Sequence, residues 1–282
     1  MNRTHFFCGV AVALSVLGGS TDVRAGTTDW QSVMGGAVRL VSADVLEDGS
    51  YLGGIEFILE QGWHTYWRYP GEAGIPPELD FSASENLGSI EVLYPAPERY
   101  DDGYSTSIVY HHGVVLPLRI KPARPDQPVR LNAKMFFGIC SDICVPGEAD
   151  LALDLSPSEA ADRSVLALIQ RDLDAVPVPE RDDAPRITQI EVVNGEDGKV
   201  MQFSAKLADP GADKTELFAE GPEGSYIGVP KLLTRTGNTA TWTLSLNGLA
   251  HSDGKTQIRF VLVDGATAVE GVRDVTIPIN KE

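Results

Sequence analysis

Alternation of apolar and polar residues at every second position constrains the first half of this chain more than any other feature. The pattern runs through residues 55–59, 114–120, 129–137 and 151–155, with turn-forming residues between the runs. A period of two is typical of antiparallel strands that bury one face. These strands do not alternate with helical segments, which argues against a βαβ unit of the thioredoxin type. The sequence therefore predicts a β-sandwich over residues 26–156.

A helix and a proline-rich linker then interrupt the strand pattern. A capping serine, a proline and a glutamate within residues 156–159 form a typical helix start. Apolar residues over 165–173 recur with helical spacing, and three prolines over 177–185 cannot continue a helix. We expect a helix at about 157–174 and a linker that extends to residue 186.

From residue 187 onward the period of two returns. The candidate strands are 187–193, 199–207, 214–219, 239–246, 256–263 and 271–279. Short strands separated by glycine-containing turns suit a second β-sandwich over residues 187–282. The expected fold is all-β, with two sandwiches joined by the helix and the Pro-rich linker of residues 157–186.

The first 25 residues are expected to be an export signal. Arg3 precedes an apolar run over residues 6–17, and Val23-Arg24-Ala25 supplies the small residues that a signal peptidase requires. The run is shorter than the ~20 apolar residues that span a bilayer, so we expect cleavage and a mature chain from Gly26. The formal net charge of −17 argues against nucleic acid as a partner, because this surface repels phosphate backbones.

Cys140 and Cys144 would be the two cysteines of the exported chain, in a compartment where they can form a disulfide. Extending the alternation of both flanking strands turns Ile139 toward the core and both cysteines away from it. The three residues between the cysteines make a short hairpin loop, so the two sulfurs should face each other. Paired Cβ atoms lie ~4.5–5.5 Å apart and a disulfide needs ~3.5–4.5 Å, so we expect a bond that is readily reduced.

Two interpretations of this pair stay open at the level of the residues. Most disulfides in exported β-domains are structural, and Asp142 and Glu148 are acidic neighbours that do not favour a thiolate. Against a structural role, closing a loop of about five residues stabilises a fold by only ~2 kcal/mol. The sequence does not say which sulfur a partner would attack.

Three segments in the first half carry a further signal. They are residues 63–74 (WHTYWRYPGEAG), residues 94–104 (YPAPERYDDGY) running into 114–118 (VVLPL), and residues 137–148 (FGICSDICVPGE). Together they resemble the N-terminal periplasmic domain of the thiol:disulfide interchange protein DsbD family, and still more its ScsB-type (suppressor of copper sensitivity) relatives. The resemblance covers roughly residues 35–155, in order.

The resemblance implies an immunoglobulin-like fold and an electron relay in the periplasm. In this family a cysteine pair takes electrons from a membrane-embedded thiol reductase domain and passes them to periplasmic thioredoxin-like or disulfide isomerase proteins. Cys140 and Cys144 would be the exchanging thiols of a thiol–disulfide oxidoreductase that uses no cofactor. Asp101, Asp102 and Tyr104 fall where the family's cap loop shields the pair.

This sequence also departs from the family pattern. Its cysteines are three residues apart where DsbD has five, and Gly103-Tyr104 stands where DsbD places a phenylalanine in the cap. No transmembrane or thioredoxin-like segment follows, so the electron donor is expected to be a separate chain. Tyr66 and Arg68 have the opposite parity to Trp63, which we assign to the core, and are therefore expected on a partner-docking surface.

Two alternatives to the electron relay remain. One is a non-catalytic binding or assembly module with a structural disulfide, and the other is a copper-binding protein. Cu(I) prefers soft thiolates, and His111, His112 or Met135 could complete a site with the cysteine pair. Adjacent histidines in a strand point to opposite faces, so at most one of the two could join. Isolated exposed histidines are the default expectation, and we assign no metal ligand.

Overall fold

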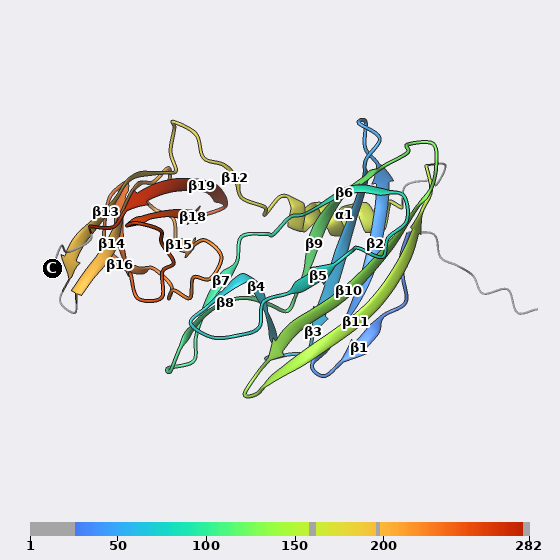
Figure 1. Cartoon of the computed structure of the whole chain (residues 1–282), viewed down its shortest axis with the longest axis horizontal. Coiled ribbons are helices and arrows are strands. Elements are labelled where there is room, and N and C mark those ends of the chain that lie inside the picture. Colours follow the sequence, from blue (N-terminus) through green and yellow to red (C-terminus); the bar gives the residue numbers. More distant parts are fainter. Residues whose placement is uncertain (1–25, 158–161, 196–197, 279–282) are drawn as a thin grey trace, which may run out of the picture.

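The computed structural model describes residues 26–157, 162–195 and 198–278, so the expected export signal lies outside the described residues. The protein is all-β apart from one helix, and it forms two immunoglobulin-like β-sandwiches joined by that helix and the Pro-rich linker (Figure 1). The fold class expected from the sequence is confirmed. Among the described residues, no helix is long and apolar enough to cross a bilayer.

The first sandwich consists of a five-stranded and a six-stranded sheet. The five-stranded sheet has the order β1 (Gln31–Val33), β2 (Gly36–Val45), β3 (Tyr51–Leu59), β9 (Gly113–Pro122) and β6 (Leu87–Val92). The facing sheet has the order β11 (Cys144–Leu155), β10 (Val129–Cys140), β4 (His64–Gly71), β8 (Thr106–His111) and β7 (Glu98–Asp101), with β5 (Glu78–Asp80) also paired to β10.

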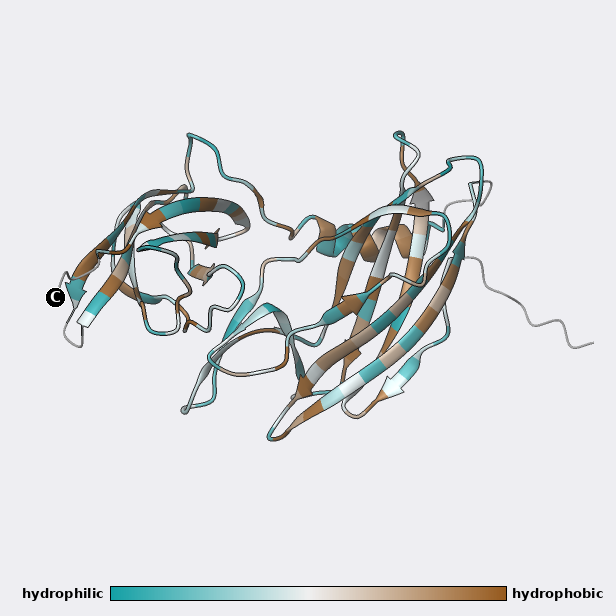
Figure 2. Cartoon of the chain, in the orientation of Figure 1, coloured by the Kyte–Doolittle hydropathy of each residue, from teal (hydrophilic) through white to brown (hydrophobic). Residues whose placement is uncertain are grey.

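The longest hairpin of the first sandwich, β10 and β11, shows why the alternating pattern predicted strands. Leu131, Met135 and Phe137 of β10 are buried in the core between the two sheets, while Lys134 between them is exposed. Bands of hydrophobic and hydrophilic residues accordingly alternate along both strands (Figure 2). Burying one face of each strand fixes the register, because a shift by one residue would expose the core side chains.

The helix α1 (Arg163–Leu173) packs on the outer face of the five-stranded sheet. Its side chains Val165 and Ile169 are buried against Val115 and other residues of that sheet, and Asp172 Oδ2 accepts a hydrogen bond of 2.6 Å from the Val115 amide. The helix is thus part of the first sandwich as well as a connection. The expected start near residue 157 is wrong, because the side chain of Asp162 caps the helix by accepting bonds from the first-turn amides.

The second sandwich consists of two four-stranded sheets. One has the order β12 (Val178–Pro179), β19 (Thr267–Thr276), β18 (Lys255–Asp264) and β15 (Thr215–Glu220); the other has the order β13 (Arg186–Gly195), β14 (Gly198–Lys206), β17 (Thr239–Ser245) and β16 (Lys231–Thr236). All six expected strands are present. The sequence did not predict β16, an exposed edge strand, or β12, which the linker adds to the sheet in parallel with β19.

Candidate functional site

Cys140 and Cys144 form a disulfide at the end of the β10–β11 hairpin. They are the last residue of β10 and the first of β11, are paired directly across the two strands, and have Cα atoms 4.1 Å apart. Within the connecting loop the Ser141 amide donates a hydrogen bond of 3.0 Å to the Ile143 carbonyl. The hairpin expected from the alternation is confirmed.

The two cysteines differ sharply in exposure. Ile139 is buried in the main core, and Cys140 lies on the opposite face of the sheet, as its parity predicts. Cys140 is nevertheless only 1% exposed, because a second small cluster formed with Tyr66, Val109 and Tyr100 covers it. Cys144 is exposed. A molecule arriving from solvent therefore meets Cys144 first.

Tyr66 of β4 contacts both sulfur atoms. Its hydroxyl donates a hydrogen bond of 2.9 Å to Cys140 Sγ and lies 3.3 Å from Cys144 Sγ. Burial raises the pKa of Tyr66 to about 12, with further contributions from nearby Asp102 and Tyr100. The hydroxyl therefore keeps its proton at neutral pH and remains a hydrogen-bond donor toward the sulfurs. Tyr66 was expected on the surface, and this expectation is wrong, since only 3% of the residue is exposed.

Two glycines make room for the Tyr66 ring. A Cβ atom on Gly74 would lie 2.1 Å from Tyr66 Cε1, and one on Gly138 would lie 3.0 Å from Tyr66 Cδ2. Gly74 also has φ at +121°, a backbone conformation that side chains rarely adopt. The last glycine of the segment 63–74 thus serves to seat the tyrosine that contacts the disulfide.

His64 is a buried neighbour of the disulfide that sequence reasoning did not single out. It is paired with Cys140 across β4 and β10, is 3% exposed, and has its ring centroid 5.4 Å from that of Tyr66 and 4.7 Å from that of Tyr100. Burial, with a smaller contribution from nearby His111, lowers the pKa of His64 to about 4, so the ring is neutral at neutral pH. The sequence carried one signal for it: His64 has the same parity as Tyr66 and therefore lies on the same face of β4.

The expected cap residues lie at the β7–β8 hairpin, with Asp101 as the last residue of β7 and Asp102 and Tyr104 in the turn that follows. Asp102 Oδ1 accepts hydrogen bonds from the amides of Ser105 and Tyr104, and these bonds lower the pKa of its carboxyl. Tyr104 is 99% exposed, so it does not cover the disulfide in this conformation. The residue of this hairpin that packs against the buried cluster is Tyr100.

Arg68 lies away from the disulfide, between the two sandwiches. Its guanidinium pairs with Glu220 and Glu270 of the second sandwich and stacks over the ring of Trp67, 4.3 Å from the centroid. The expected role on a docking surface is therefore incorrect for Arg68. Trp67 is the fully buried tryptophan of this segment, while Trp63 is half-buried and packs against the edge of the core.

The residues considered for copper do not gather around the sulfurs. Met135 is buried in the main core, on the face of β10 opposite to Cys140. His111 Nδ1 lies 2.8 Å from Glu98 Oε2, and His112 is exposed in the turn after β8. Over the described ranges, no group of three or more His, Cys, Asp or Glu side chains is placed to hold a metal ion.

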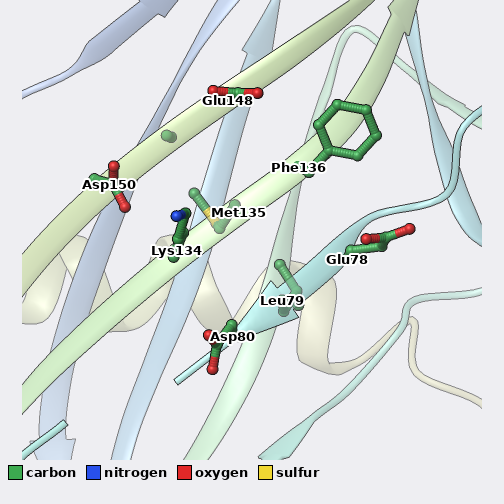
Figure 3. A pocket seen from close by; sticks show the side chains of 9 residues that line it. Glu78, Leu79, Asp80, Lys134, Met135, Phe136, Glu148 and Asp150 are labelled. Atoms are coloured by element: carbon green, nitrogen blue, oxygen red, sulfur yellow. The ribbon is translucent and has the colours of Figure 1, made fainter. Parts of the chain in front are cut away.

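A shallow pocket of about 430 Å³ lies on the outer face of β5, β10 and β11 (Figure 3). It is on the same face of the hairpin as the disulfide, farther from the tip. Lys134 is flanked across the strands by Asp80 and Asp150, and Phe136 by Glu78 and Glu148. Four carboxylates and one lysine thus share this part of the face, so it is negatively charged.

Comparisons with known proteins agree with this geometry. Residues 37–156 match the family model described as thiol:disulfide interchange protein DsbD, N-terminal. No curated protein matches the chain significantly. The fold is similar to the crystal structure of the N-terminal periplasmic domain of ScsB from Proteus mirabilis, with a TM-score of 0.70 at 21% identity, covering 90% of this chain and 100% of that one.

A second solved structure, the endo-fucoidan hydrolase MfFcnA9 of glycoside hydrolase family 107, aligns with a TM-score of only 0.21 at 10% identity, over 79% of this chain and 34% of that one, which is too low to indicate a shared fold. The sandwich that holds the Cys140–Cys144 disulfide therefore matches the DsbD N-terminal family, within a two-sandwich fold similar to that of the ScsB N-terminal domain.

Proposed function

We propose that this chain is a periplasmic thiol:disulfide interchange module that relays electrons through Cys140 and Cys144. The observation that carries the proposal is the asymmetry of the disulfide, in which an exposed Cys144 is joined to a buried Cys140 at the end of a hairpin. The match of residues 37–156 to the DsbD N-terminal family supports the same reaction class.

The exposure of Cys144 makes it the sulfur that exchanges with partners. A thiolate of the donor attacks Cys144 Sγ, the bond between the two cysteines breaks, and its electron pair leaves with Cys140 as a thiolate. The Tyr66 hydroxyl, which already donates to Cys140 Sγ, is placed to stabilise this charge. The second donor thiol then attacks the mixed disulfide and releases Cys144. Two electrons have passed, the donor pair is oxidised, and this chain holds a dithiol.

Delivery to the acceptor reverses these steps. The Cys144 thiolate attacks the acceptor's disulfide, and Cys140 then resolves the mixed disulfide, which returns the acceptor as a dithiol. By resemblance, the donor is a membrane-embedded thiol reductase domain on a separate chain, and the acceptors are periplasmic thioredoxin-like or disulfide isomerase proteins. Asp101 at the end of β7, with Asp102 and Tyr104 in the turn after it, can contact such partners.

Trapping of mixed disulfides tests the proposal. In the chain that begins at Gly26, Cys140→Ala leaves the exposed Cys144 without its resolving partner, and Cys144→Ala leaves only the buried Cys140. We expect stable mixed disulfides with periplasmic proteins in the first variant and few in the second, identified by non-reducing electrophoresis and mass spectrometry. If neither variant traps a partner, the relay is wrong.

The alternative is a structural disulfide, and the equilibrium with glutathione distinguishes it. A reduction potential below roughly −300 mV would indicate an inert cross-link, and a higher one would indicate a bond that exchanges. The short loop between Cys140 and Cys144 favours exchange, because so small a ring adds little stability.

A further inference from the structure

The strand that covers the buried cysteine also binds the second sandwich. Tyr100 and Arg99 are neighbours in β7, so their side chains point to opposite faces of the sheet. Tyr100 packs against the cluster around Cys140, with its ring centroid 4.7 Å from that of His64. Arg99 binds the second sandwich, with Nε 3.0 Å from Glu216 Oε2 and Nη2 donating a 2.7 Å hydrogen bond to the Pro230 carbonyl.

Besides its pairing with β8 and the contact of Glu98 with His111 on that strand, β7 has little else to hold it in place. It contains four residues, and in the described part of the chain it forms the edge of its sheet beside β8. A short edge strand with one neighbour opens more readily than a central strand. The side chains of Arg99 and Glu216 are each 24% exposed, so their ion pair is partly shielded from solvent. An ion pair in this setting, with a second bond to a carbonyl, restrains the strand more than a fully exposed pair would.

Two further contacts tie the neighbouring strands to the same sandwich. Tyr69 of β4 exchanges hydrogen bonds with the backbone of Ile227, whose carbonyl accepts at 2.6 Å from the Tyr69 hydroxyl. Glu72, just after β4, accepts at its carbonyl from the Tyr226 hydroxyl and at Oε2 from the amide of Thr106, the first residue of β8. Tyr69 and Glu72 thus tie β4 and β8 to the second sandwich beside β7, and Figure 1 shows β4, β7 and β8 on the side of the first sandwich toward the second.

We infer that the second sandwich supports the β7–β8 hairpin, and that the contact of Arg99 with Glu216 and Pro230 sets how closely Tyr100 covers Cys140. The effect of this contact on electron transfer, as distinct from its effect on the exposure of Cys140, rests on the proposed function. Arg99 is a positioning residue in this arrangement, because it acts on the sulfur through Tyr100. The role assigned to residues 187–282 is to control access to a site that lies wholly in the first sandwich.

Site-resolved alkylation of the reduced full chain tests this inference. Iodoacetamide is added at fixed pH, and the labelling rates of Cys140 and Cys144 are followed separately by peptide mass spectrometry. Arg99→Ala is expected to raise the rate at Cys140 by about tenfold, the change in local opening that follows loss of a charge-assisted contact, and to leave Cys144 within about twofold. The matched control is Arg39→Ala, which breaks the half-buried Arg39–Glu56 pair between β2 and β3 and should change neither rate.

A charge exchange separates positioning from general loosening. Arg99→Glu alone should give the fastest labelling of Cys140, and the double variant Arg99→Glu, Glu216→Arg should bring the rate back toward that of the native chain. If Arg99→Ala lowers the thermal midpoint of the whole chain, Glu216→Gln in the second sandwich provides the milder test of the same contact.

Unchanged labelling of Cys140 in both Arg99→Ala and Glu216→Gln would overturn the inference, as would equal acceleration in Arg39→Ala. The alkylation requires no redox partner. Failure to trap partners would therefore overturn the relay and leave the alkylation result intact. Unchanged alkylation of Cys140 would overturn the role of Arg99 and leave the relay intact.

Discussion

Replacing Tyr66 by phenylalanine should slow reduction of the disulfide. The substitution removes the hydroxyl that lies 2.9 Å from Cys140 Sγ and leaves the ring in the space beside Gly74 and Gly138. A hydrogen bond to a charged group stabilises a protein by ~1.5–3 kcal/mol, and a large sulfur acceptor places this bond near the lower limit. The leaving sulfur carries only part of its charge in the transition state, so only part of this energy is lost there. We expect the activation free energy of reduction to rise by about 0.7–1.4 kcal/mol, which makes the reaction about three- to tenfold slower, since ~1.4 kcal/mol corresponds to a factor of ten in rate.

The assay is reduction by dithiothreitol at pH 7, quenched with acid and followed by counting alkylated thiols by mass. Tyr110→Phe is the matched control, because the Tyr110 hydroxyl is also buried but donates to the Pro95 carbonyl at 2.8 Å. The control should lose stability, since a buried carbonyl is left without its donor, and should keep the native reduction rate. A Tyr66→Phe variant that is reduced as fast as the native chain, or faster, would refute the proposed stabilisation of the leaving sulfur.

Three further predictions concern stability, each measured by urea unfolding. The pKa of His64 is lowered to about 4, whereas an unfolded histidine titrates near 6.5, so the unfolded chain binds more protons between these pH values. The free energy of unfolding should therefore fall by at most about 3 kcal/mol as the pH drops through this window. His64→Gln should abolish this pH dependence and the exposed His251→Gln should keep it; equal pH slopes in the two variants would contradict the assignment to His64. Ile169→Ala should lower the free energy of unfolding by ~2–5 kcal/mol because it leaves a cavity under α1, while Gln170→Ala, at an exposed position, should change it by no more than about 0.5 kcal/mol. An Ile169→Ala variant as stable as the native chain would show that the helix is not part of the first sandwich. Reducing the disulfide of Cys140 should cost about 2 kcal/mol, and a loss above about 4 would favour a structural cross-link.

The strand pattern predicted the backbone of the site well. Alternation through 129–137 and 151–155 predicted the hairpin, the direct pairing of Cys140 with Cys144, and the face on which they lie. Local signals worked less well at the helix, where Ser156 and Pro157 indicated a start but Asp162 caps the first turn. Several polar residues can cap a helix, and packing on the sheet decides which of them does.

The surroundings of the sulfurs could not be predicted from parity. Parity tells which face of a strand a side chain occupies, and it does not tell what covers that face. Tyr66 and Arg68 were both expected at the surface, yet the β7–β8 hairpin covers the first and the second sandwich contacts the other. His64 was missed for the same reason, since its burial depends on Tyr100 and His111 from strands distant in the sequence.

The absence of side chains at Gly74 and Gly138 has a consequence for protein engineering. Grafting the cysteine hairpin onto another immunoglobulin-like scaffold would transfer the sulfurs but not the hydroxyl beside them, because an ordinary residue at either glycine position would displace the aromatic ring. A transplant that is meant to keep the native reactivity must therefore carry two separate pieces of chain: the hairpin with Gly138, and the continuous segment from the strand with Tyr66 to the bend at Gly74.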